Sequence, residues 1–204
     1  MAERAHPESK YFKPQWKFRL RKGFIPWLTR KESPYAKAAK WRFKWVADHC
    51  IDMDVLDIPC GMGWGTSFLK HPKSVVGVDV SEEAIREARS RYSRVGEFKT
   101  GSMEVLNFPD ESFDRVVCLE GIEHVDLDIG RRFIAEAHRI LRAGGKLLIS
   151  SPYCADGTHS GNPFHIHEYQ PEEILGLLSD KFTIHSKIER EVDKMHVLYI
   201  ECVK

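Results

Sequence analysis

The sequence has no hydrophobic run long enough to cross a membrane. None of its 204 residues lies in an apolar stretch near the roughly 18 residues of a membrane span, which excludes a transmembrane protein. The first ten residues contain no apolar core of the kind found in secretory signals. The five cysteines are scattered and form no CxxC pair, which argues against a disulfide scaffold or a zinc ribbon. We therefore expect a protein of the reducing cytoplasm.

The near-neutral net charge of +1 hides an uneven distribution of charge. Residues 1–45 contain 13 Lys and Arg against 3 Glu, a balance of +10, and the remaining residues carry a balance of −9. The same 45 residues hold 10 of the 22 aromatic residues, including four of the five Trp. We therefore expect a basic, aromatic-rich arm at 1–33, followed by a main domain at 34–204.

From residue 53 onward, short strand-like runs alternate with helical segments. Predicted strands lie at 55–58, 74–79, 97–100, 113–119, 146–151, 182–189 and 195–203, and predicted helices lie at 34–49, 65–71, 82–93, 126–142 and 171–180. Ser81 is the expected N-cap of the third of these helices, and Gly144-Gly145 is the expected end of the fourth. This alternation predicts an α/β fold with a doubly wound, mainly parallel sheet and helices on both faces. A ligand is expected beyond the carboxyl ends of the strands, beside the first strand.

The loop after the first strand indicates what kind of ligand binds there. It reads Cys60-Gly-Met-Gly-Trp-Gly65, a G-x-G-x-G spacing, and Asp57 stands immediately upstream. Asp57 would repel the pyrophosphate of a dinucleotide, whereas it would attract the ammonium and sulfonium groups of S-adenosylmethionine (SAM). Asp79, which ends the second strand, can accept hydrogen bonds from both ribose hydroxyls. The alternative is that Asp57 caps the loop and Asp79 caps a helix.

Four segments resemble the successive motifs of class I SAM-dependent methyltransferases. They are VLDIPCGMGWGTSFL (55–69), VVGVDVSEEAI (75–85), GSMEVLNFPDESFDRVVCLEGIEHV (101–125) and EAHRILRAGGKLLISSPY (136–153). The resemblance covers residues 53 to about 180. It implies a Rossmann-like sheet of seven strands whose seventh strand is antiparallel, with SAM as cofactor and S-adenosylhomocysteine as product. The cofactor-binding residues that it implies are Asp57, Pro59, Gly61, Gly63, Asp79, Val80, Ser102, Met103 and Leu119.

The segment after the fourth strand supplies candidates for the transfer chemistry. In a helical turn Glu120, Glu123 and His124 would share one face and converge at the sulfonium end of the site. A long loop after the fifth strand brings His165 and His167 toward the acceptor. The pKa of a histidine lies near 6.5, which suits a general base for a hydroxyl acceptor. We assign His124, Glu123 and His165 to catalysis, with His165 or His167 orienting the acceptor or sharing the role of base.

The same side chains admit other interpretations. Glu120, Glu123, His124 and one loop histidine form an E-x-x-E-H…H set suited to Mg, Mn or Zn, and the set is similar to that of metal-dependent small-RNA 2′-O-methyltransferases and some quinone-ring O-methyltransferases. The two glutamates could instead be carboxylates that stabilise the start of a helix, with His124 closing the floor of the pocket. We do not favour the metal and assign no metal ligands.

Two features of the sequence bear on the acceptor and on other partners, namely a loop after the fifth strand and the basic arm. The loop NPFHIHEY (162–169), followed by PEEI, resembles methyltransferases of glycan and surface-polysaccharide assembly, which implies O-methylation of a small-molecule, sugar or glycan-like hydroxyl. The basic arm can contact nucleic acid, an anionic saccharide or an acidic membrane surface through residues 1–45, or its aromatics can pack on the domain as a lid. The acidic remainder of the chain makes a nucleic acid the less favoured partner. Alternative functions are a metal-dependent RNA ribose 2′-O-methyltransferase and a non-catalytic SAM-binding module.

Overall fold

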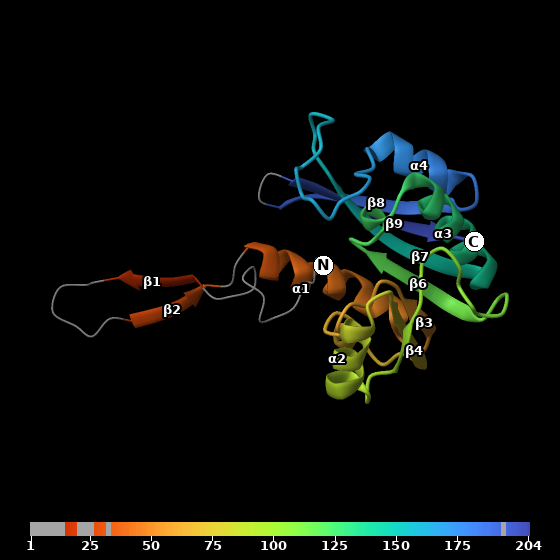
Figure 1. Ribbon diagram of the computed structural model, residues 1–204, viewed down its shortest axis with the longest axis horizontal. Coiled ribbons are helices and arrows are strands. Elements are labelled where there is room, and N and C mark those ends of the chain that lie inside the picture. The colour runs from red at the N-terminus through yellow and green to blue at the C-terminus, as the bar shows by residue number, and fades with distance from the viewer. Residues whose placement is uncertain (1–14, 20–26, 32–33, 193–194) are drawn as a thin grey trace.

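A seven-stranded sheet forms the centre of the molecule. The structure is a computed structural model that describes residues 15–19, 27–31, 34–192 and 195–204 (Figure 1). The strands of the sheet are β3 (Asp54–Asp57), β4 (Ser74–Asp79), β5 (Glu97–Thr100), β6 (Phe113–Leu119), β7 (Leu141–Tyr153), β8 (Thr183–Val192) and β9 (Met195–Val203). Their spatial order is β5-β4-β3-β6-β7-β9-β8. The first five run parallel to one another, whereas β9 is antiparallel to both β7 and β8. This topology confirms the predicted fold class, including the antiparallel seventh strand.

Helices cover both faces of this sheet. They are α1 (Pro34–Ala47), α2 (Glu82–Tyr92), α3 (Leu127–Ile140) and α4 (Pro171–Ser179). One face of the sheet packs against apolar side chains of α3 and α4, such as Phe133 and Leu178. The opposite face packs against Val46 at the end of α1. Because β3 is a central strand covered on both faces, all four of its residues are buried, and buried and exposed positions do not alternate along it.

Capping side chains and a proline mark the starts of α2, α3 and α4. The Ser81 side chain accepts a hydrogen bond from the backbone N–H of Ala84 at the start of α2, as predicted. The Asp126 side chain does the same for the N–H of Ile129 at the start of α3. Pro171 occupies the first turn of α4, where its missing N–H removes no helical hydrogen bond.

Two segments differ most from the predicted elements, the junction of α3 with β7 and residues 65–71. Helix α3 ends at Ile140, before the predicted stop at Gly144-Gly145, because Leu141 is extended and buried and pairs with Phe113 as the first residue of β7. The helix predicted at 65–71 is reduced to a single 3-10 turn, Thr66–Phe68, called η2. In both places tertiary packing overrides a local helical pattern.

Helix α1 belongs to the main domain even though it carries part of the basic, aromatic segment. Trp41 and Trp45 contact the ring of Tyr199 on β9, with ring centroids 4.9 and 5.4 Å apart. Phe43 packs on Phe68, 6.1 Å between centroids. These aromatics therefore form a packed layer over the sheet, as the lid alternative expects, rather than a free stacking surface. Further toward the N-terminus, β1 (Gln15–Arg19) and β2 (Trp27–Lys31) pair as an antiparallel hairpin, and the remainder of the arm lies outside the described residues.

No helix in the described part of the chain is long and apolar enough to span a bilayer.

Candidate active site

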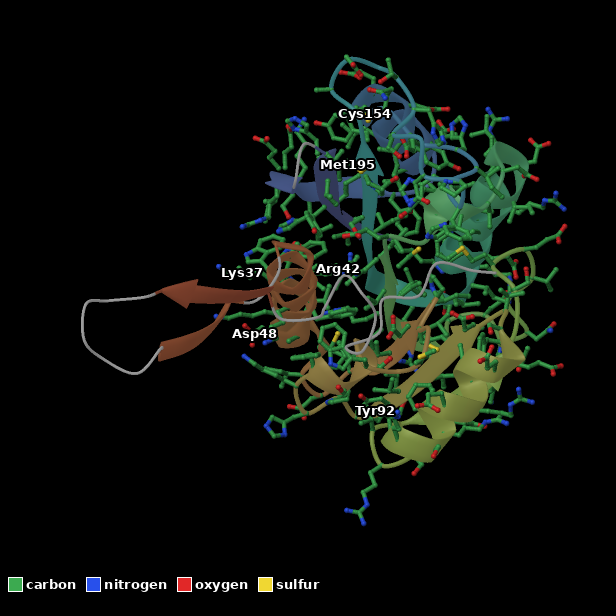
Figure 2. All side chains as sticks on the ribbon, turned by 60° about the vertical axis from the view of Figure 1, so that its left-hand side comes forward. Lys37, Arg42, Asp48, Tyr92, Cys154 and Met195 are labelled. Atoms are coloured by element: carbon green, nitrogen blue, oxygen red, sulfur yellow. The ribbon has the colours of Figure 1, made fainter. Side chains whose placement is uncertain are left out.

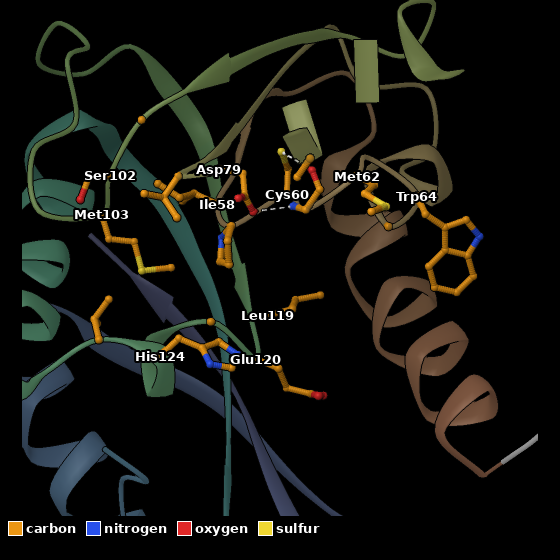
Figure 3. Close-up of a pocket in the computed structure, with 18 of the residues that line it drawn as sticks. Ile58, Cys60, Met62, Trp64, Asp79, Ser102, Met103, Leu119, Glu120 and His124 are labelled. Atoms are coloured by element: carbon orange, nitrogen blue, oxygen red, sulfur yellow. Dashed lines mark hydrogen bonds between the residues drawn. The ribbon is translucent and has the colours of Figure 1, made fainter. Parts of the chain in front are cut away.

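A pocket of about 350 Å³ opens at the carboxyl ends of β3, β4 and β6 (Figure 3). Its volume lies within the range of small-molecule binding sites. Asp79 and the glycine loop form one side, and Leu119, Glu120 and His124 form the other. Of the predicted site residues, the pocket wall contains Pro59, Gly61, Asp79, Val80, Ser102, Met103, Leu119 and His124.

Steric constraints shape the glycine loop between β3 and η2. Gly63 has a φ of +79°, and a Cβ there would lie 3.0 Å from the Phe98 ring. Gly65 leaves no room at all, since a Cβ would come within 1.9 Å of Phe43. Gly63 thus supports the loop without belonging to the pocket wall, and Gly65 allows α1 to approach the loop closely.

Asp79 connects the glycine loop to the end of β4. Its Oδ2 accepts a hydrogen bond of 2.9 Å from the N–H of Gly61, and its Oδ1 accepts one of 2.8 Å from the N–H of Ser81. The carboxylate is 9% exposed and lies on the pocket wall. It therefore fixes the shape of the loop and leaves further acceptor capacity for two ligand hydroxyls.

Asp57 lies beneath the loop and does not reach the pocket wall. Its Oδ2 accepts a hydrogen bond of 2.6 Å from the Thr66 hydroxyl, and the side chain is buried. Burial raises the pKa of Asp57 to about 7, and nearby Asp79 contributes in the same direction. Asp57 thus supports the loop from below and is not part of the pocket wall, which is the position expected if it caps the loop.

The raised pKa of Asp57 leads to a prediction about stability. The folded protein keeps the Asp57 proton up to about pH 7, whereas the unfolded chain loses it near pH 4, so this group lowers stability as pH rises between those values. Asp57→Asn removes the group, and we expect the variant to gain stability relative to wild type, by at most about 4 kcal/mol, between pH 4 and pH 8. Urea unfolding of both proteins at pH 5 and pH 8 measures this difference. A difference independent of pH would contradict the prediction.

Arg42 is a site residue that the sequence analysis did not find. It belongs to α1 (Figure 2) and lines the pocket, and its guanidinium makes an ion pair with Oε2 of Glu120. Arg42 is buried, and among the described residues its Nε has no hydrogen-bond partner. A buried donor without a partner is costly, which makes Arg42 a candidate contact for an anionic ligand group. No motif marks Arg42, because its position depends on how α1 packs across the sheet.

The acidic cluster after β6 does not share one face, contrary to the prediction. Glu120 has a φ of +47°, and only Ile122–His124 forms a 3-10 turn, η3. Glu120 therefore turns toward Arg42, whereas Glu123 points into the interior and is 1% exposed. Burial, together with the charge of Glu120, raises the pKa of Glu123 to about 8. Within the described residues, Oε2 of Glu123 has no hydrogen-bond partner.

His124 lies on the pocket wall in a defined orientation. Its Nδ1 is 2.8 Å from the carbonyl oxygen of Phe164. Since a carbonyl can only accept, Nδ1 carries the hydrogen, and a neutral ring has its lone pair on Nε2. Such a ring can accept a proton from a ligand in the pocket.

His165 and Glu123 lie behind His124 and not on the pocket wall. The rings of His165 and His124 are 5.2 Å apart. One possible ligand atom from each of Glu123, His124 and His165 lies within 4.8 Å of the others, so these three side chains could hold a metal ion. His167 instead points toward Glu173, with Nε2 2.8 Å from Oε1.

The predicted adenine-side residues differ in exposure. Met103 is 7% exposed, whereas Val80 is 70% exposed at the rim of the pocket. The Ser102 hydroxyl accepts a hydrogen bond of 3.1 Å from the N–H of Glu104. Leu119, at the end of β6, is 8% exposed. Together these residues line the part of the pocket next to Asp79 at the end of β4.

The fold and the pocket define a Rossmann-like domain for a nucleoside-containing cofactor. A glycine loop follows the first strand of the sheet, a carboxylate ends the second, and the pocket lies at the carboxyl ends of both.

Comparison with known proteins supports a methyltransferase. Residues 56–149 match a family described as a methyltransferase domain. A probable S-adenosylmethionine-dependent methyltransferase of Mycolicibacterium smegmatis is 33% identical over 157 residues, which is 74% of this chain and 57% of that protein. The phthiotriol/phenolphthiotriol dimycocerosates methyltransferase of Mycobacterium tuberculosis is 41% identical over 95 residues, 45% of this chain and 34% of that protein. A solved SAM-dependent methyltransferase of Methanosarcina mazei is 26% identical with a TM-score of 0.62, covering 75% of this chain and 92% of that one. These likenesses support a class I SAM-dependent methyltransferase domain, and the chain spans little more than half the length of the first relative.

Proposed function

We propose that this protein is a SAM-dependent methyltransferase that transfers a methyl group to a hydroxyl of a small-molecule, sugar or glycan-like acceptor. The observation that supports this proposal best is that Asp79 and His124 line the same pocket from opposite sides. One side offers a buried carboxylate suited to ribose, and the other offers an imidazole whose Nε2 lone pair can accept a proton. A cofactor and a hydroxyl acceptor can therefore meet within one cavity.

The residues of the pocket fit the chemistry of SAM. Asp79 would accept hydrogen bonds from the ribose hydroxyls, and Val80, Ser102 and Met103 would flank the adenine. Along the methionine chain lie Pro59, Gly61 and Leu119, with Asp57 and Gly63 holding the shape of the loop. The partnerless Nε of Arg42 suits the carboxylate, and the Glu120 carboxylate suits the positive charges. When bound, SAM supplies a methyl group on a positively charged sulfur and becomes S-adenosylhomocysteine after transfer.

On the acceptor side, His124 has the central role. Nε2 of His124 would take up the hydroxyl proton as the acceptor oxygen replaces the cofactor sulfur on the methyl carbon. The Phe164 carbonyl holds the ring in the tautomer that can do so. Glu123 and His165 support this part of the site from behind the ring. A relative named for a triol acceptor, the phthiotriol/phenolphthiotriol dimycocerosates methyltransferase, is consistent with a hydroxyl acceptor.

The test of this function is transfer of a labelled methyl group. The full chain is incubated with methyl-labelled SAM and a panel of sugars, glycans, hydroxylated lipids, amines and RNA. Label that accumulates in an ether of a hydroxyl acceptor, with formation of S-adenosylhomocysteine, is the expected result. Label found only on nitrogen or carbon would contradict O-methylation, and failure to bind SAM would contradict the whole proposal.

A divalent-metal-dependent transfer to RNA ribose is the second candidate. The observation in its favour is the proximity of Glu123, His124 and His165. In that case transfer to RNA in the same panel would be abolished by a chelator and restored by Mg²⁺, Mn²⁺ or Zn²⁺. Contact of residues 1–45 with RNA or a membrane surface stays a prediction, because most of that arm lies outside the described residues.

A further inference from the structure

We propose that Glu168 is a positioning residue of the acceptor site, which fixes the loop of residues 159–168 and, through it, the reactive tautomer of His124. This inference rests on the proposed function, because it explains how the proton-accepting ring is held. Glu168 itself does not line the pocket. Its effect passes through His165 and the Phe164 carbonyl.

The first step is the buried environment of the Glu168 carboxylate. Its side chain is 2% exposed. Oε2 accepts a hydrogen bond of 2.8 Å from the N–H of Ser160, and Oε1 contacts both the Ser160 hydroxyl and Nδ1 of His165. Burial raises the pKa of Glu168, but the hydrogen bonds from Ser160 and His165 outweigh it and hold that pKa below its usual value. An ionised carboxylate thus joins the two ends of the loop.

The second step is the tautomer of His165, which its neighbours determine. Oδ1 of Asn162 accepts a hydrogen bond of 3.1 Å from the N–H of Phe164, and this contact fixes the orientation of the amide. Nδ2 of Asn162 therefore donates to Nε2 of His165, 2.9 Å away. Since Nε2 accepts, the hydrogen of a neutral ring lies on Nδ1 and points at Glu168. Each polar atom of His165 is consequently matched by a partner of the opposite kind.

The third step connects this loop to the turn that carries His124. The N–H groups of Ile166 and His167 both donate to the carbonyl of Glu123, at 2.7 and 3.1 Å. In return, Nδ1 of His124 donates to the carbonyl of Phe164 at 2.8 Å. The Phe164 carbonyl is the contact that places the hydrogen of His124 on Nδ1. A shift of the loop would remove that contact and allow the ring to turn or to change tautomer.

A second Glu–His pair in the same region serves as a matched control. His167 and Glu173 make the same type of contact, with Nε2 and Oε1 2.8 Å apart. Their side chains are 32% and 35% exposed, and neither residue lines the pocket. Replacing Glu173, in the first turn of α4, by Gln changes the same chemical group without removing a contact to His165 or Phe164.

The experiment compares E168Q, E168D and E173Q with the wild-type protein. For E168Q we expect kcat to fall by about 100-fold, the size of effect caused by misplacing a reacting group by roughly 1 Å, while the Kd for SAM changes less than twofold. E168D retains a carboxylate and should recover part of the loss, and E173Q should behave as wild type. Equal losses in E168Q and E173Q, or a wild-type kcat in E168Q, would overturn the proposal.

A measurement that needs no acceptor separates this inference from the proposed function. In ¹⁵N spectra of the histidine rings, the wild-type protein should show His124 and His165 as Nδ1–H tautomers, and E168Q should change both signals. E173Q should leave both unchanged. Unaltered His124 signals in E168Q would overturn the positioning role even if methyl transfer is never detected. If E168Q does not fold, S160A provides a second test, because it removes one donor to Glu168. S160A should show the same changes in the histidine signals at smaller size. Unaltered signals in S160A would overturn the positioning role as well.

Discussion

Replacing His124 by alanine is expected to lower kcat by about 100-fold to 10,000-fold, the range typical of general acid–base catalysis. The physical reason is the loss of the Nε2 lone pair that takes the hydroxyl proton, while the cofactor side of the pocket keeps all its contacts. The Kd for SAM should therefore stay within about twofold of wild type. Initial rates with labelled SAM and calorimetric binding of SAM measure the two effects separately.

A histidine outside the pocket provides the control for this variant. His185 on β8 is exposed, and His185→Ala should leave both quantities unchanged. Undiminished turnover of His124→Ala would remove His124 from the mechanism. A parallel loss of SAM binding would instead make His124 part of the cofactor site.

Replacing Asp79 by alanine is expected to weaken SAM binding by about 10-fold to 100-fold. The expected loss corresponds to one charge-assisted hydrogen bond, about 1.5–3 kcal/mol, and release of the Gly61 and Ser81 N–H groups adds to it. Because the ribose contact is the same in substrate and product, S-adenosylhomocysteine should lose affinity by the same factor. Calorimetry with both compounds checks this equality.

The matched control for Asp79 is an acid on the surface. Asp128 is 80% exposed in the first turn of α3, and its replacement by alanine should leave affinity unchanged. Wild-type affinity in Asp79→Ala, with an unchanged thermal midpoint, would refute the assignment of the ribose acid.

The order and type of the main elements could be predicted because the signals that determine them are local. The predicted strands 74–79, 97–100 and 113–119 coincide with β4, β5 and β6. Capping by Ser81 and the proline at the start of α4 are likewise properties of a few adjacent residues. The glycine loop and Asp79 could be predicted for the same reason, because they are neighbours that belong to consecutive elements of the sheet.

The parts that sequence did not reveal depend on distant packing. Arg42 enters the pocket because α1 crosses the sheet, and neither its neighbours nor its spacing mark it. Asp57 lies beneath the loop because Thr66, nine residues later, returns to cover it. Glu120 turns toward Arg42, away from Glu123, because it adopts a positive φ, which a helical spacing rule does not anticipate.

The central claim is that one pocket holds the ribose of the cofactor at Asp79 and its sulfur on the side of Leu119 and His124. A crystal structure of the protein grown with S-adenosylhomocysteine tests it most directly. We predict ribose hydroxyls on the Asp79 carboxylate, the carboxylate of the ligand on Arg42, and the sulfur facing His124. A pocket that stays empty at saturating ligand, or one that binds a nicotinamide dinucleotide in its place, would contradict the account.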